Sequence, residues 1–182
     1  MKLNIQPVTY KSTFSYYTFE NIFSNQDFLE LKQACSKYPF ALITAKRTSN
    51  INRIWTCNLT ENIFVKLNKI FDSKETKELF SNIVGISLTN ARTRIELCND
   101  KKGSWLENHV DDKDKLFVMQ IYLTNLTKST IIDNTQTKAR ENSGWFFANT
   151  SKEYHRLSPL EENRASIIIH YVKNWNKVET LI

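Results

Sequence analysis

The chain has 182 residues, of which 41% are hydrophobic and 24% charged, enough apolar material to bury the core of one domain. Its 11 Phe, 7 Tyr and 4 Trp, set against 3 Gly and 3 Pro, exclude collagen-like, elastic and linker-like proteins. A net charge of +6 allows a polyanionic partner, but the basic residues are scattered along the chain. We interpret them as a solvated surface and expect no nucleic-acid partner.

The sequence carries no signal for a membrane or for export. No run approaches the roughly 18 consecutive apolar residues of a spanning helix, and the first residues lack the apolar segment of a secretory leader. The three cysteines, Cys35, Cys57 and Cys98, are odd in number and form no CxxC pair, which disfavours a disulfide framework and a zinc ribbon. We expect a cytoplasmic protein without a membrane span.

Helical signals dominate the first 85 residues. Apolar residues recur there at the spacing that places them on one helix face, and polar residues that can cap a helix precede them. The pattern predicts three helices: one capped by Asp27 and running to Cys35, one capped by Thr60 and running to Phe71, and one over Ser73 to Ile83 that ends at Gly85.

After residue 85 the pattern changes to the alternation of β-strands. Strand-like segments follow one another without helices between them, at 91–98, 117–123, 129–132, 145–147 and 164–172. This order favours an α+β fold, mainly β, in which an antiparallel sandwich or barrel is buttressed by N-terminal helices. A parallel α/β sheet is disfavoured, and no repeat or linker marks a domain boundary.

Two of the three histidines stand where a metal site is expected. His109 and Asp111 form an H-x-D pair just before a strand, and alternate residues of an extended chain project from one face. His155 follows the aromatic strand at 145–147. Two histidines and one carboxylate make the facial triad that suits non-haem Fe(II) and leaves coordination positions open. Alone, the H-x-D pair also fits a surface turn with a local His–Asp hydrogen bond.

A basic residue for an acidic cosubstrate lies on the last predicted strand. The open positions of such a metal suit a chelating 2-oxo acid together with O2, and the far carboxylate of that acid needs a cation. Arg164 meets this need, because a guanidinium stays charged and pairs with a carboxylate through two N–H groups. Ser166 shares the strand parity of Arg164, so its hydroxyl can bond the same carboxylate.

The ordered set His109-x-Asp111, His155 and Arg164-x-Ser166 resembles the Fe(II)/2-oxoglutarate-dependent oxygenases, in particular their prolyl-4-hydroxylase-like branch. The resemblance covers roughly residues 90 to 173. It implies a double-stranded β-helix, or jelly roll, in which His109, Asp111 and His155 bind Fe(II). Arg164, with Ser166, would anchor 2-oxoglutarate. The implied activity is that of a dioxygenase that uses O2 to hydroxylate an unactivated C–H bond and converts 2-oxoglutarate to succinate.

The resemblance implies one oxygenase domain over residues 1–182. Residues 1–85 are expected to form the helical support and the substrate side, and residues 86–175 the jelly-roll core with the metal site. The substrate class stays open between a small molecule, an amino acid or peptide, and a sugar. The oligomeric state is equally open.

Other interpretations of the same residues remain. A non-catalytic jelly-roll module would bind a ligand without turnover, and a basic nucleic-acid-binding protein would show steep salt dependence. His170 lies on the strand of Arg164, about 20 Å further at roughly 3.3 Å per residue, so we predict a structural role for it. Arg92, Arg94 and Glu96 form a charged strand face that either lines the substrate entrance or is solvated.

Overall fold

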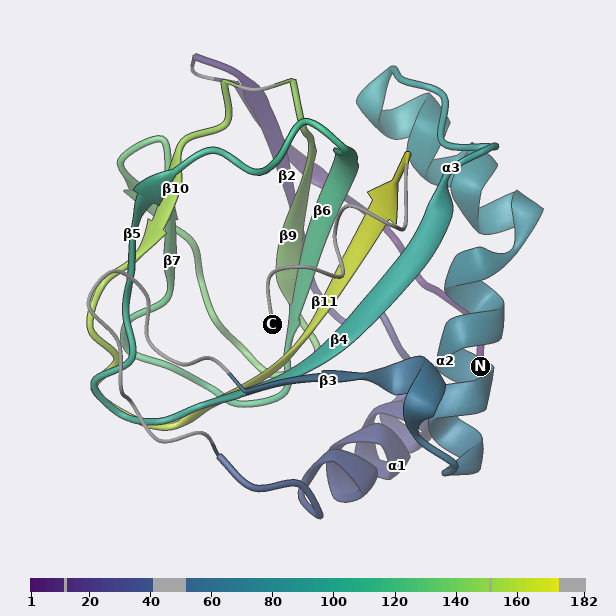
Figure 1. Cartoon of the computed structure of the whole chain (residues 1–182), viewed down its shortest axis with the longest axis vertical. Coiled ribbons are helices and arrows are strands. Elements are labelled where there is room, and N and C mark those ends of the chain that lie inside the picture. Colours follow the sequence, from purple (N-terminus) through teal and green to yellow (C-terminus); the bar gives the residue numbers. More distant parts are fainter. Residues whose placement is uncertain (12, 41–51, 151, 174–182) are drawn as a thin grey trace.

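A computed structural model describes residues 1–11, 13–40, 52–150 and 152–173. Figure 1 shows two β-sheets facing each other, with helices packed on the outer face of the larger sheet. The strands are β1 (Val8–Lys11), β2 (Ser15–Phe19), β3 (Asn52–Trp55), β4 (Arg92–Asp100), β5 (Leu106–His109), β6 (Lys115–Tyr122), β7 (Thr130–Ile132), β8 (Thr135–Gln136), β9 (Gly144–Ala148), β10 (His155–Leu157) and β11 (Arg164–Val172). The helices are α1 (Asn25–Cys35), the short 3-10 helix η1 (Thr56–Asn58), α2 (Asn62–Asp72) and α3 (Lys74–Val84).

The two sheets are wound from one continuous series of strands. The larger sheet has the order β1-β2-β9-β6-β11-β4-β3, and the smaller one has the order β5-β10-β7-β8. From β4 onward the chain passes repeatedly from the larger sheet to the smaller and back, with antiparallel neighbours. This winding is that of a double-stranded β-helix, so the predicted jelly roll buttressed by helices is confirmed.

Strand alternation gives the larger sheet two different faces, and β11 shows both of them. Ile167, Ile169 and Tyr171 are fully buried in the core that the sheet forms with the helices. The residues of opposite parity face the smaller sheet. Among them, Arg164 and His170 line a cavity between the sheets. One face of β11 therefore serves stability and the other serves the site.

The helices cover the first of these faces with aromatic side chains. Phe71 and Phe80 are fully buried and stack on each other. The ring of Phe80 also lies 5.0 Å from that of Phe117 on β6 and 5.3 Å from that of Phe146 on β9. Burying each such ring contributes about 2–3 kcal/mol, which makes the helices the main support of the sheet. In the described part of the chain, no helix has the length and apolar character needed to cross a membrane.

All three predicted helices are present, but two of them begin at other residues than expected. The cap of α1 is Ser24, whose Oγ accepts from the backbone N–H of Asp27 at 3.1 Å, so Asp27 belongs to the first turn. The residue before α2 is Glu61 rather than Thr60. The third helix ends as predicted at Gly85, which has φ +76° and tolerates this left-handed conformation because it lacks a Cβ.

Three strands were missed in the first 85 residues. β1, β2 and β3 occupy the two edges of the larger sheet, where β2 pairs with β9 and β3 pairs with β4. Each has only four or five residues, and the whole of β1 is exposed, so none carries a strong alternation. Residues 1–85 thus supply sheet edges as well as the helices.

Candidate metal centre

His109 and His155 lie opposite each other on neighbouring strands of the smaller sheet. His109 ends β5 and His155 begins β10, and the two are direct pairing partners with ring centroids 4.2 Å apart. In each ring Nδ1 contacts a backbone carbonyl two residues earlier, that of Glu107 at 2.9 Å and that of Glu153 at 3.0 Å. A carbonyl accepts only, so Nδ1 carries the proton, and Nε2 is the nitrogen with a lone pair for a metal.

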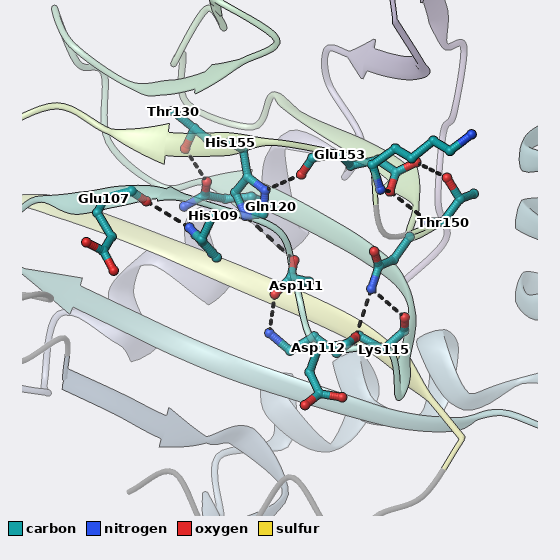
Figure 2. A network of polar contacts seen from close by, with 12 residues as sticks. Glu107, His109, Asp111, Asp112, Lys115, Gln120, Thr130, Thr150, Glu153 and His155 are labelled. Carbon is teal, nitrogen blue, oxygen red and sulfur yellow. Dashed lines mark hydrogen bonds and ion pairs between the residues drawn. The ribbon is translucent and has the colours of Figure 1, made fainter.

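The loop before β10 is fixed by the carboxylate of Glu153, as Figure 2 shows. This carboxylate accepts from the backbone N–H of Thr150 at 2.7 Å and from that of Lys152 at 2.9 Å. Glu153 therefore orients His155 through its carbonyl while its side chain closes the preceding turn. Both contacts set the direction of the His155 ring.

Asp111 completes the group with two carboxylate oxygens in different surroundings. Its Oδ1 lies 2.5 Å from Nζ of Lys115, whereas its Oδ2 lies 3.6 Å from Nε2 of His155. Oδ2 is buried, and among the described residues it accepts no hydrogen bond. A buried carboxylate oxygen without a donor is costly unless a cation binds it, so Oδ2 is a free ligand atom.

The charge states of these side chains suit a cation. Burial acts to raise the pKa of Asp111, but the charge of Lys115 and the imidazoles of His155 and His170 hold it far below its usual range. Burial lowers the pKa of His155, and His109 adds to this, although Asp111 opposes it. At neutral pH the carboxylate is ionised and the imidazole of His155 is neutral, which are the forms that ligate metals.

The three predicted ligands are thus brought together. One ligand atom from each of His109, Asp111 and His155 lies within 4.8 Å of the others, and Figure 2 shows the three side chains converging. Two imidazole nitrogens and one carboxylate oxygen on one side of a site fit a divalent ion such as Fe(II). The donor set, the orphaned Oδ2 and the ring orientations all agree with that fit.

The group opens on a cavity of about 120 Å³ between the two sheets. Trp145 lines it beside His155, whose ring lies 6.2 Å from that of Trp145 and 5.4 Å from that of Phe147. Arg164 lines the same cavity, as the sequence predicts, although it stands 53 positions after Asp111 in the chain. The fold therefore joins the metal group and the predicted anchor in one space.

Arg164 has a partner that sequence analysis missed. Its Nε donates to Oδ2 of Asp100 at 2.8 Å, and its Nη2 donates to the same oxygen. Both side chains are buried, and the two residues are direct partners across β11 and β4. Asp100 ends β4, beyond the strand predicted at 91–98, and belongs to no motif, so only the register of β4 and β11 could have found it.

Ser166 is less directly placed than predicted. It is fully buried, and its Oγ accepts from Nε2 of Gln120 at 2.9 Å, so Gln120 rather than Ser166 lines the cavity here. Oε1 of Gln120 in turn accepts from Thr130 at 2.9 Å. Tyr122 lies beside this pair and accepts from Nε1 of Trp145 at 3.1 Å. These hydrogen bonds fix the polar wall between the metal group and Arg164.

The charged face of β4 belongs to the interior, so its solvated alternative is wrong for two of the three residues. Glu96 is buried, lines the cavity and forms an ion pair with Arg94, which also lies 5.3 Å from the ring centre of Trp55. Arg92 is exposed. His170, predicted to be structural, is buried in the cavity wall and stands outside the ligand group found among the described residues.

Comparison with known proteins gives matches among solved structures. No protein-family model matches the chain, and no curated protein does. The chain is similar to a Pseudomonas putida prolyl-4-hydroxylase, with TM-score 0.69 and 10% identity over 87% of this chain and 92% of that one. It is similar to a Trichoplax adhaerens prolyl hydroxylase in complex with a hypoxia inducible factor oxygen degradation domain peptide fragment, with TM-score 0.68 and 13% identity over 92% and 87%. It is also similar to the viral collagen prolyl hydroxylase of Paramecium bursaria Chlorella virus-1 in its 2OG complex, with TM-score 0.61 and 15% identity over 86% and 94%.

The fold is therefore that of the Fe(II)/2-oxoglutarate-dependent oxygenases. Within that class, the similar structures named above are prolyl hydroxylases, in agreement with the branch that the sequence resembles. At these identities the likeness is one of fold. The chemistry of the site has to be argued from its own residues.

Proposed function

We propose that the chain is an Fe(II)- and 2-oxoglutarate-dependent dioxygenase that hydroxylates an unactivated C–H bond. The observation that carries the proposal is the orphaned Oδ2 of Asp111, which lies beside Nε2 of His155 in a cavity that also contains Arg164. His109, Asp111 and His155 would hold the iron, and Arg164 would pair with the far carboxylate of 2-oxoglutarate. Bound together with O2, these groups supply an oxidation that couples decarboxylation to succinate with hydroxylation of the substrate.

The charges of the cavity support a dianionic cosubstrate. Three ion pairs in or beside the cavity, Asp111 with Lys115, Asp100 with Arg164 and Glu96 with Arg94, each have no net charge. A divalent metal would add two positive charges to these paired groups, and a dicarboxylate would balance them. Since uncompensated charge in a buried site is costly, metal and dicarboxylate are expected to bind as a matched set.

Arg164 retains hydrogen-bonding capacity for this role. Asp100 takes its Nε and Nη2 through a single oxygen, whereas a guanidinium has five N–H groups. The bond with Asp100 fixes the plane of the guanidinium, which leaves the Nη1 side for an incoming carboxylate. Gln120 and Thr130, which line the cavity, would provide polar contacts for the cosubstrate.

The substrate remains the open part of the proposal. A small molecule, an amino acid or peptide, and a sugar each stay candidates, and proline in a peptide is the first to test because the similar structures are prolyl hydroxylases. A cytoplasmic location likewise stays a prediction.

The test is anaerobic. Fe(II) and then 2-oxoglutarate are added to the purified chain, and the weak visible charge-transfer band of a chelated complex is recorded for the unaltered protein, Asp111→Ala and Arg164→Met. We expect the band in the unaltered protein, its loss in Asp111→Ala, and a higher 2-oxoglutarate requirement in Arg164→Met. The matched control is Asp112→Ala, which removes the exposed neighbouring carboxylate and should keep the band. A folded protein that binds Fe(II) without any band would favour the non-catalytic ligand-binding module.

A further inference from the structure

We infer that Lys115 is a positioning residue that restricts Asp111 to one-oxygen ligation and so keeps a coordination position open on the metal. This inference rests on the proposed metal centre and concerns a side chain that does not itself bind the ion. Lys115 touches the ligand, not the substrate or the reacting atoms. Its effect would be to decide how many sites the metal offers to the cosubstrate and O2.

The first step of the argument is the choice of partner by Lys115. The loop before β6 contains three acids, and Asp112 and Asp114 are closer in sequence to Lys115 than Asp111 is. The ammonium nevertheless contacts Asp111, at 2.5 Å, and lines the cavity of the metal group. By contrast, Lys113 in the same loop is exposed. The pair of Lys115 is therefore directed into the site and is not a surface ion pair.

The second step is the rigidity of the backbone that carries Lys115. Its N–H donates to the carbonyl of Asp112 at 3.0 Å, and its own carbonyl accepts from Nδ2 of Asn149 at 2.8 Å. It is also paired with Val172 across β6 and β11. These contacts fix the backbone of Lys115, so its side chain starts from a defined position and its ammonium stays near Asp111. A lysine on an unpaired loop would lack this restraint.

The third step is the division of labour between the two oxygens of Asp111. Oδ1 takes the ammonium of Lys115, while the buried Oδ2 accepts no hydrogen bond from the described residues and faces His155. A carboxylate binds a metal through one oxygen or through both. Binding through both would require Oδ1 to leave a short, charge-assisted hydrogen bond, which is the strong kind. Lys115 thus favours ligation through Oδ2 alone.

The consequence is a count of open positions. An octahedral ion held by two imidazoles and one carboxylate oxygen retains three positions, enough for a chelating 2-oxo acid and O2. If both oxygens of Asp111 bound, only two positions would remain, and chelation would leave none for O2. Lys115 would therefore protect the chemistry of the site rather than strengthen its hold on the metal, because the ammonium repels a bound cation.

The experiment counts metal-bound water. Mn(II), which suits nitrogen and oxygen ligands, is bound to the full chain, and water-proton relaxation gives the number of inner-sphere waters before and after 2-oxoglutarate is added. We compare the unaltered protein with Lys115→Met, which keeps an apolar stem without the charge, and with Lys115→Arg, which keeps the charge. Lys113→Met is the matched control, because it makes the same charge change two residues away on an exposed side chain.

We expect three waters in the unaltered protein, in Lys115→Arg and in Lys113→Met, and two in Lys115→Met. Mn(II) affinity in Lys115→Met should be equal or higher. After 2-oxoglutarate takes two positions, one water should remain on the metal of the unaltered protein and none on that of Lys115→Met. A merely structural role would weaken Mn(II) binding without changing the number of waters on the bound ion. If Lys115→Met does not fold, Lys115→Ala carries the same expectations.

The two failures can be told apart. Three waters in folded Lys115→Met, with one left after 2-oxoglutarate is added, would overturn the inference on Lys115 and leave the proposed metal centre intact. An unaltered protein that binds neither Mn(II) nor Fe(II) would overturn the proposed function, and the inference with it.

Discussion

The buried pair between Asp100 and Arg164 makes a prediction that joins stability to cosubstrate binding. Replacing Asp100 by Asn removes the negative charge with almost no change of shape. Both side chains are buried, with relative exposures of 0% for Asp100 and 4% for Arg164, so water cannot replace the lost counter-charge. The guanidinium is then left as an uncompensated charge inside the molecule.

The size of the effect follows from that burial. Removing one partner of a buried ion pair costs about 3–5 kcal/mol, and in a chain of this length each kcal/mol lowers the melting temperature by about 2–4 °C. We expect Asp100→Asn to lower the melting temperature by about 6–20 °C. A dicarboxylate that binds Arg164 would supply the missing charge, so 2-oxoglutarate with metal should stabilise Asp100→Asn more than the unaltered protein.

The assay is thermal unfolding of the metal-free protein, followed by circular dichroism and repeated with Mn(II) and 2-oxoglutarate. Glu161→Gln serves as the reference, because Glu161 forms a 2.8 Å pair with Lys128 in which both side chains are about half exposed. The double variant Asp100→Leu/Arg164→Leu should be more stable than Asp100→Asn, because it removes both charges. If Asp100→Asn lost no more stability than Glu161→Gln, the reasoning from burial would be refuted.

Two further predictions concern the fold. A Cβ added at Gly144 would lie 1.8 Å from the backbone oxygen of Gln120, so Gly144→Ala must push β9 away from β6. Urea denaturation should show that the free energy of unfolding falls by about 3 kcal/mol or more. An unchanged urea midpoint would contradict this contact. Cys57 is exposed, whereas Cys35 and Cys98 are buried, and burial raises the pKa of the Cys35 thiol to about 12. A thiol reagent should therefore modify one cysteine rapidly in the native protein and three after unfolding. Because the folded pKa of Cys35 is raised, its contribution to stability is present below the unfolded pKa of about 8.5 and is lost as pH rises toward 12. Unfolding measured as a function of pH would detect this loss. Rapid reaction of all three thiols in the native protein would contradict the burial of Cys35 and Cys98.

Much of the architecture was predictable from the sequence because local signals were strong. The predicted strand at 164–172 coincides with β11, whose run of isoleucines has high β propensity and is buried. The third helix was predicted at its C-terminus by Gly85, which supplies the left-handed conformation of the cap. The short edge strand β3 escaped prediction, since its partner β4 lies far along the chain. β1 pairs with the nearby β2, but all its residues are exposed and it shows no alternation.

For the site, the sequence by itself determined the candidate ligands and their order. His109, Asp111 and His155 were predicted from spacing and strand context, and Arg164 from its charge on the last strand. The tertiary structure alone decided their partners: the register of β11 on β4 sets Asp100 against Arg164, and the loop before β6 brings Lys115 back to Asp111. The physical reason is that a charged residue pairs with the residue that lies close to it in the folded chain, because a buried charge without a partner is costly. Local sequence determines neither this distance nor the burial.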